Sequence, residues 1–116
     1  MKDYKVKFKV EDKEYSAIFN LNVMEQIQNK YGTIKKWGEL TDAKSGEPNA
    51  EAIKFGFMAM MNEAIEIENE ETGENKPLFT INQVGRIISR AGIDKSATAL
   101  NQAVIEATKE DSPKNE

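Results

Sequence analysis

Three glutamates come closest to the paired carboxylates that acid/base catalysis requires. Glu63, Glu66 and Glu68 fall within one predicted helix, but they point in different directions around it and make no obvious pair. The chain contains neither Cys nor His. Disulfides, iron–sulfur clusters, Cys/His zinc sites, and catalysis by thiolate or imidazole are therefore excluded. We predict a protein that is not an enzyme and uses no cofactor or metal.

Two arginines form the clearest cationic pair. Arg86 and Arg90, the only arginines, are four residues apart and share one face of a predicted helix. They could stay solvated and pair with surface carboxylates, or they could grip the carboxylate of a partner bidentately. The formal net charge is -4, which argues against a general polyanion-binding surface. We therefore expect no nucleic-acid partner.

The chain has 116 residues, which suits one domain. Hydrophobic residues make up 39% and charged residues 31%, which is not a disordered composition. No apolar run approaches about 18 residues, and no apolar signal segment follows the N-terminus, so we expect no membrane partner. A chain without Cys fits a reducing cytoplasm. We assign residues 1–108 to one domain and residues 109–116 to a flexible polar tail.

The first 20 residues alternate apolar and polar side chains in two runs. Residues 4–10 place Tyr, Val and Phe on one face and three lysines (Lys5, Lys7, Lys9) on the other. After a polar turn, residues 14–20 alternate Tyr15, Ala17 and Phe19 with polar side chains that include Asn20. We predict a β-hairpin whose apolar face needs helices to cover it. The lysine row is interpreted either as a solvated edge that resists aggregation or as a strip that contacts a partner.

Helical periodicity predicts five helices near residues 22–31, 34–40, 50–68, 81–91 and 96–108. The expected N-caps are Asn22, Thr33, Asn49, Thr80 and Ser96. Gly32 and Gly92 are expected to end two of the helices. Residues 41–49 and the acidic residues 68–76 are expected to be surface loops. The fold class is therefore α+β, with an N-terminal hairpin packed against a small array of about five α-helices and covering part of the long central one.

The order of these patterns resembles the tail assembly chaperones of long-tailed phages, in particular those of Gram-positive hosts and their prophages. The resemblance spans about residues 4–108 and is one of apolar and turn patterns. The matching stretches are residues 4–10 with Glu14 and Tyr15, then 19–22, 25–27, 30–32, 52–55, 78–86, 103–104 and 106–107.

This resemblance implies a protein that binds the tape-measure protein, keeps it soluble and helps recruit tail-tube subunits during tail morphogenesis. It implies action in the cytoplasm of the bacterial host and absence from the mature virion. Many members exist in a short and a frameshifted long form, and this chain ends soon after its last helix as the short form does. The alternatives are a tail or head–tail component retained in the virion, and a small regulatory binding protein that uses the lysine row.

The physical basis of such a function would be the reversible covering of apolar surface. The central predicted helix is apolar on more than one side, which is typical of a buried helix or of one that meets a partner. Possible self-association along the partner would add avidity. The candidate partner-binding residues are the anchors Trp37 and Phe55, the adaptable Met58 and Met61, and the cations Arg86 and Arg90.

Overall fold

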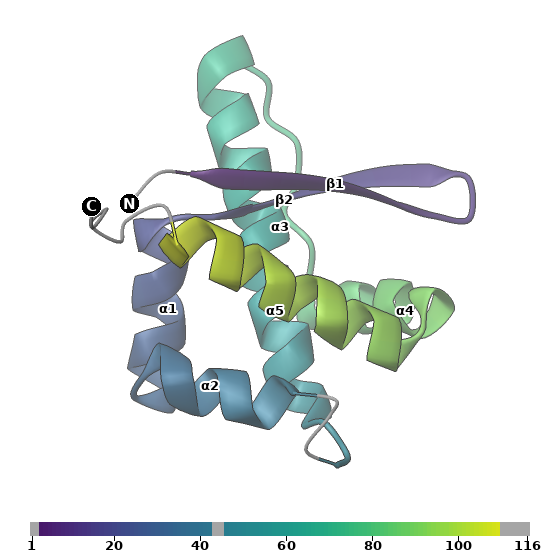
Figure 1. Cartoon of the computed structure of the whole chain (residues 1–116). Coiled ribbons are helices and arrows are strands. Elements are labelled where there is room, and N and C mark those ends of the chain that lie inside the picture. Colours follow the sequence, from purple (N-terminus) through teal and green to yellow (C-terminus); the bar gives the residue numbers. More distant parts are fainter. Residues whose placement is uncertain (1–2, 43–45, 110–116) are drawn as a thin grey trace.

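The structure is a computed structural model, and it describes residues 3–42 and 46–109. The described residues form an N-terminal hairpin followed by five helices, so the expected α+β class is confirmed (Figure 1). Residues 110–116 of the expected tail and residues 43–45 of the first expected loop lie outside the described residues. The elements are β1 (Tyr4–Val10), β2 (Lys13–Phe19), α1 (Leu21–Tyr31), α2 (Ile34–Thr41), α3 (Ala50–Thr72), α4 (Ile81–Ala91) and α5 (Ile93–Lys109).

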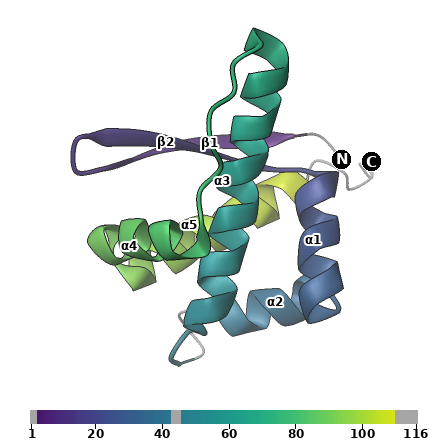
Figure 2. The same cartoon turned by 180° about the vertical axis from the view of Figure 1, so that it is seen from behind.

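The hairpin pairs β1 and β2 antiparallel, with Tyr4 opposite Phe19 and Val10 opposite Lys13. Its apolar face packs on the central helix, because the ring of Phe8 lies 5.8 Å from the ring of Phe57 on α3. This confirms the expected cover of α3 by the hairpin. Strand β2 lies along α3, whereas β1 lies on the far side of the hairpin, nearer to α5 and α4 (Figures 1 and 2).

The polar face of the hairpin is wet along β1 but not along the whole of β2. Lys5 and its neighbouring lysines are exposed, as the alternation predicts. Ile18 stands opposite Lys5 and is nevertheless only 5% exposed, because the C-terminal half of α3 closes over this end of β2. Asn20 is buried as well, which corrects its expected place on the wet side. Ile18, which is an apolar residue on the lysine face of the hairpin, is therefore part of the protein interior.

Local capping signals place three helix starts correctly and two incorrectly. Thr33, Asn49 and Thr80 accept hydrogen bonds as N-caps, as expected. Helix α1 is instead capped by Asn20, which accepts from the N–H of Val23, so the assignment of Asn22 is wrong. Helix α5 begins at Ile93, so Ser96 lies inside the helix and is not its cap.

Helix α3 is longer than its periodicity indicates. It continues to Thr72, where Gly73 adopts a left-handed conformation with φ of 77° and ends it. Residues 68–72 are therefore helical, and only residues 73–76 of the expected acidic loop lie outside the helix. The far end of α3 projects beyond the hairpin (Figure 1).

A single hydrophobic core gathers side chains from both strands and all of the helices described. Its centre is α3, against which α2 packs closely through Trp37. The largest fully buried side chains are Trp37, Phe19, Ile27, Ile53, Met60, Met61 and Leu100. The helices around α3 thus hold the hairpin on one side and leave an apolar opening beside β1.

Candidate functional site: an apolar groove

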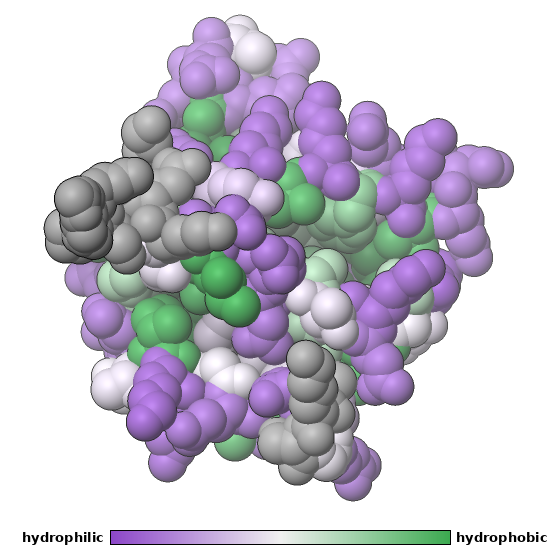
Figure 3. Space-filling model, in the orientation of Figure 1, coloured by the Kyte–Doolittle hydropathy of each residue, from purple (hydrophilic) through white to green (hydrophobic). Residues whose placement is uncertain are grey.

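An apolar groove opens between the hairpin and helices α4 and α5. It has a volume of about 240 Å³, and its floor is formed by Phe57, Met60 and Met61 of α3. In Figure 3, apolar side chains gather between the polar surface of the hairpin and α5. The walls are built from Val6, Phe8 and Lys9 of β1, Ala17 of β2, Ile87, Ile88 and Ala91 of α4, and Lys95, Ser96, Ala99, Leu100 and Ala103 of α5.

The groove exists because α5 presents small side chains to β1. Ser96, Ala99 and Ala103 line it from positions that share one face of the helix at spacings of three and four residues. Ala91, at the end of α4, continues this surface of small side chains. Large residues at these positions would fill the space beneath β1, so the small ones keep it open.

The groove is suited to binding apolar side chains. Ser96 offers one hydroxyl, and none of the described residues that line the groove carries a carboxylate. Each apolar side chain that a partner buried here would contribute about 1.5–3 kcal/mol. Met60 and Met61 in the floor can adjust to side chains of different shape.

Two of the candidate partner-binding residues, Trp37 and Met61, are buried in the core. Trp37 is 0% exposed, and its indole N–H donates to the carbonyl of Ala52 at 3.0 Å. Its ring lies directly over Gly56. The interpretation of Trp37 as a surface anchor is therefore wrong, because the ring is used to pack α2 on α3. Met61 is 1% exposed and could meet a partner only through the groove, where it forms part of the floor.

Phe55 and Met58 are partly buried and pack against the core from outside the groove. The ring of Phe55 meets the ring of Tyr31 edge-on at 5.8 Å, and the ammonium of Lys30 lies 5.5 Å from its centre. The Phe55 ring thus stabilises the packing of α1 against α3. A role of Phe55 or Met58 in binding a partner stays a prediction.

Arg86 and Arg90 lie on a separate surface. Both are exposed, and together with Lys54 they line a shallow hollow on α4 that no carboxylate of the described residues lines. A Cβ on Gly85 would lie 3.0 Å from Cδ of Lys54, so the missing side chain lets this lysine lie across α4. Ile87 and Ile88 face the groove instead, which places the arginine pair on the other side of the helix.

The acidic residues of α3 have different surroundings, as their spacing indicates. Glu63 is 7% exposed, and its Oε2 accepts from the side-chain amides of Asn20 at 2.8 Å and Asn22 at 3.1 Å. Glu68 instead pairs with Lys76 in solvent at 3.0 Å, and this hydrogen bond raises the pKa of Lys76. Within the described part of the chain, no group of three or more acidic residues could hold a metal ion.

Apart from Met61, and Lys9 of the lysine row, the residues that line the groove were not predicted as a site. Alternation along β1 placed Val6 and Phe8 on an apolar face, and the natural interpretation of that face was as core. Ala99 was even harder to find, because a small residue in a helix carries no signal of its own. The distance between β1 and α5 decides whether such residues enclose a core or line an opening, and no local pattern encodes that distance.

Comparisons of the chain with protein-family models, curated proteins and solved structures found no match. Among the helices that the structure describes, none is long and apolar enough to cross a membrane.

Proposed function

We propose that this protein is a tail assembly chaperone of a long-tailed phage, which binds the tape-measure protein and keeps it soluble. It also helps to recruit tail-tube subunits, acts in the cytoplasm of the bacterial host and leaves before the virion is complete. The observation that carries the proposal is the open apolar groove beside β1. The patterns along residues 4–108, which resemble those of this chaperone family, are its second support.

The groove fits the task that such a chaperone performs. A tape-measure protein is long and helical, and its apolar seams are exposed until the tube encloses them. A helix laid along the groove would insert a few apolar side chains between Phe8 and Ala99 and above Met60. The gain from a few side chains is partly offset by the entropy lost on association, so one contact is weak and reversible. Several copies along one tape-measure chain would bind more firmly through avidity.

The test is co-expression with the tape-measure protein of the same phage. We expect the chain to raise the soluble fraction of that protein and to co-purify with it. Ala99→Trp should fill the groove and weaken the complex by about tenfold or more, because the partner's side chains lose their space. Thr98→Trp is the matched control, since Thr98 is also exposed but lines a different hollow, between α2 and α5.

Two results would contradict this function. An unchanged soluble fraction together with the absence of a complex would remove the tape-measure protein as the partner. Detection of the chain in purified virions at a fixed copy number would identify a structural tail or head–tail component instead.

A further inference from the structure

The two arginines of α4, Arg86 and Arg90, are exposed and line a hollow that carries only positive charge. Lys54 of α3 lies beside them, and the other residues that line the hollow are uncharged. None of these three cations forms an ion pair with a described residue. The arginines are four residues apart on one helix face, where like charges repel each other. The arginine pair therefore favours an anionic group that approaches the hollow from outside.

The C-terminal part of α3 carries a matching pair of carboxylates. Glu66 and Glu70 are exposed and lie four residues apart on one face of the helix, and neither is paired within the part of the chain that the structure describes. They repel each other as the arginines do. Glu70 also lies in the last turn, which contains no basic residue and where the helix dipole is negative. Cations brought to this glutamate pair would therefore stabilise the end of α3.

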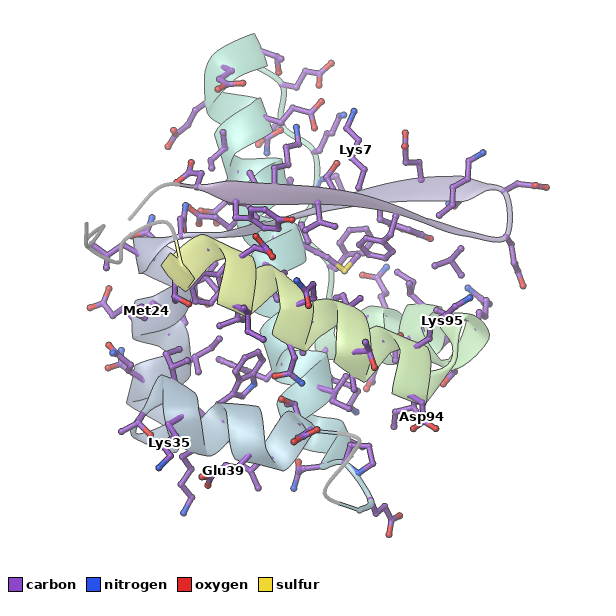
Figure 4. All side chains as sticks on the ribbon, viewed as in Figure 1. Lys7, Met24, Lys35, Glu39, Asp94 and Lys95 are labelled. Carbon is purple, nitrogen blue, oxygen red and sulfur yellow. The ribbon has the colours of Figure 1, made fainter. Side chains whose placement is uncertain are left out.

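The other acidic residues at this end already have cations close by. Glu68 and Glu74 both pair with Lys76, at 3.0 and 3.6 Å. Glu71 lines the hollow at the outer face of the hairpin, which Lys7 lines as well. In Figure 4, Lys7 points to the side of the hairpin on which α3 projects. The glutamate pair does not line that hollow, so its two carboxylates stay available to another molecule.

The arginine pair and the glutamate pair are too far apart to meet within one chain. Lys54, which lines the hollow, precedes Glu66 and Glu70 by 12 and 16 residues of the same helix. At the helical rise per residue, these positions lie about 18–24 Å further along α3. The end of α3 projects beyond the hairpin, where a second molecule has access to it (Figure 1). The contact must therefore form between two molecules.

We propose that the glutamate pair of one copy of this chain binds the arginine pair of a second copy, so that the end of α3 lies on α4 of its neighbour. Both pairs have a spacing of four residues, about 6 Å along each helix, so the two ion pairs form together. Guanidinium groups bind carboxylates bidentately, and Lys54 adds a third cation. The inference goes beyond the proposed function, since neither pair lines the apolar groove.

The contact is expected to be weak, because exposed ion pairs contribute little individually. We expect a dissociation constant on the order of 0.1–1 mM at low salt. Copies bound side by side along one long partner would reach effective concentrations in this range. Self-association would then add to the avidity of the chain for such a partner.

Sedimentation equilibrium of the full chain tests whether it associates with itself. At about 0.02 M salt, we expect the weight-average mass to rise as the protein concentration approaches about 1 mM. At about 0.5 M salt, the mass should return to that of one chain, because the charges are screened. The mass of a single chain at every concentration in low salt would overturn the inference.

Charge reversal tests whether the two pairs meet. The hollow variant, Arg86→Glu with Arg90→Glu, and the end variant, Glu66→Arg with Glu70→Arg, should each associate about tenfold more weakly or not at all. An equimolar mixture of the two variants should associate again, because each reversed pair then finds a complementary one. The chain with all four substitutions should associate for the same reason. If neither the mixture nor this chain associates, the two pairs do not bind each other.

Lys35→Glu with Lys36→Glu is the matched control, because it changes the net charge as much as the hollow variant does. Both lysines are exposed on α2, and Figure 4 shows Lys35 on the part of the molecule away from α4. This variant should associate as the wild type does. A loss as large as that of the hollow variant would mean that the net charge governs association, and the proposed contact would be wrong.

The inference and the proposed function fail separately. Ala99→Trp fills the groove and should leave self-association unchanged, because neither charged pair lies there. A chain that associates through the two pairs but leaves the tape-measure protein insoluble contradicts the chaperone function alone.

Discussion

At the scale of single residues, the hydroxyl group of Tyr31 does not fit its surroundings. This hydroxyl is buried and has no hydrogen-bond partner among the described residues. Burial raises the pKa of this phenol, and the nearby carboxylate of Glu51 raises it further. The ring itself is well placed, with its edge against Phe55 at 5.8 Å. The ring therefore stabilises the contact between α1 and α3, while the hydroxyl costs free energy.

Tyr31→Phe keeps the ring and removes this hydroxyl, so it should raise the free energy of unfolding by about 1 kcal/mol at pH 7. The gain should grow above about pH 10, because an unfolded tyrosine ionises there while the folded phenol of the wild type keeps its proton. Urea unfolding at both pH values measures the two effects. Tyr15→Phe, at another partly exposed tyrosine, is the matched control and should change stability little at pH 7. A variant at Tyr31 that is less stable at pH 7 would show that the hydroxyl is satisfied.

At the scale of elements, the crossing of α2 and α3 depends on a glycine. Gly56 leaves the space in which the Trp37 ring lies, and a Cβ at this position would be 3.1 Å from Cε2 and closer still to Cζ2. The indole N–H is bound to the carbonyl of Ala52, one turn earlier on α3. The indole ring is thus held by its contact with Gly56 and by its hydrogen bond to Ala52. It cannot move aside without losing this buried hydrogen bond.

Gly56→Ala should therefore destabilise the protein by about 1–3 kcal/mol, although alanine is the better helix former. Gly38→Ala is the matched control within α2. Its Cβ would meet nothing closer than Oδ1 of Asn101 at 4.0 Å, so the helix propensity should stabilise the protein by up to about 1 kcal/mol. Thermal unfolding of both variants measures the two changes in stability. Equal shifts in the same direction would show that the Trp37 ring does not restrict Gly56.

The elements that could be predicted from the sequence are those whose signals are local. The alternation of residues 4–10 gives β1, and Thr80 with Gln83 forms the expected capping box at the start of α4. The start of α1 was misassigned because Asn20 and Asn22 have the same capping chemistry, and Glu63, 43 residues from Asn20, binds both amides. The start of α5 was misassigned because Gly92 ends α4 and its carbonyl also accepts the N–H of Ser96.

At the scale of the whole molecule, the groove depends on how α4 is held beside the hairpin. The chain between α3 and α4 runs back along α3. Two asparagines of α3, which are seven residues apart on one face of that helix, bind its backbone. Asn62 donates to the carbonyl of Phe79 at 3.1 Å and accepts from its N–H at 2.8 Å. Asn69 binds the backbone of Lys76 in the same way, at 3.1 and 3.0 Å. Helix α4 begins at Ile81, two residues after Phe79. The two hydrogen bonds to Phe79 therefore position α4, which forms one wall of the groove.

Asn62→Ala should therefore reduce both stability and binding. It removes two partly buried hydrogen bonds, at a cost of about 2 kcal/mol, and should free α4 to move, which hydrogen exchange in that helix would detect. Co-purification with the tape-measure protein should weaken in parallel. Asn69→Ala removes the same pair of bonds in solvent, so it should cost less than about 1 kcal/mol and leave binding unchanged. If the two variants behave alike, α4 is positioned by the ring of Phe79, which lies 6.0 Å from that of Tyr15 on β2, rather than by the asparagine.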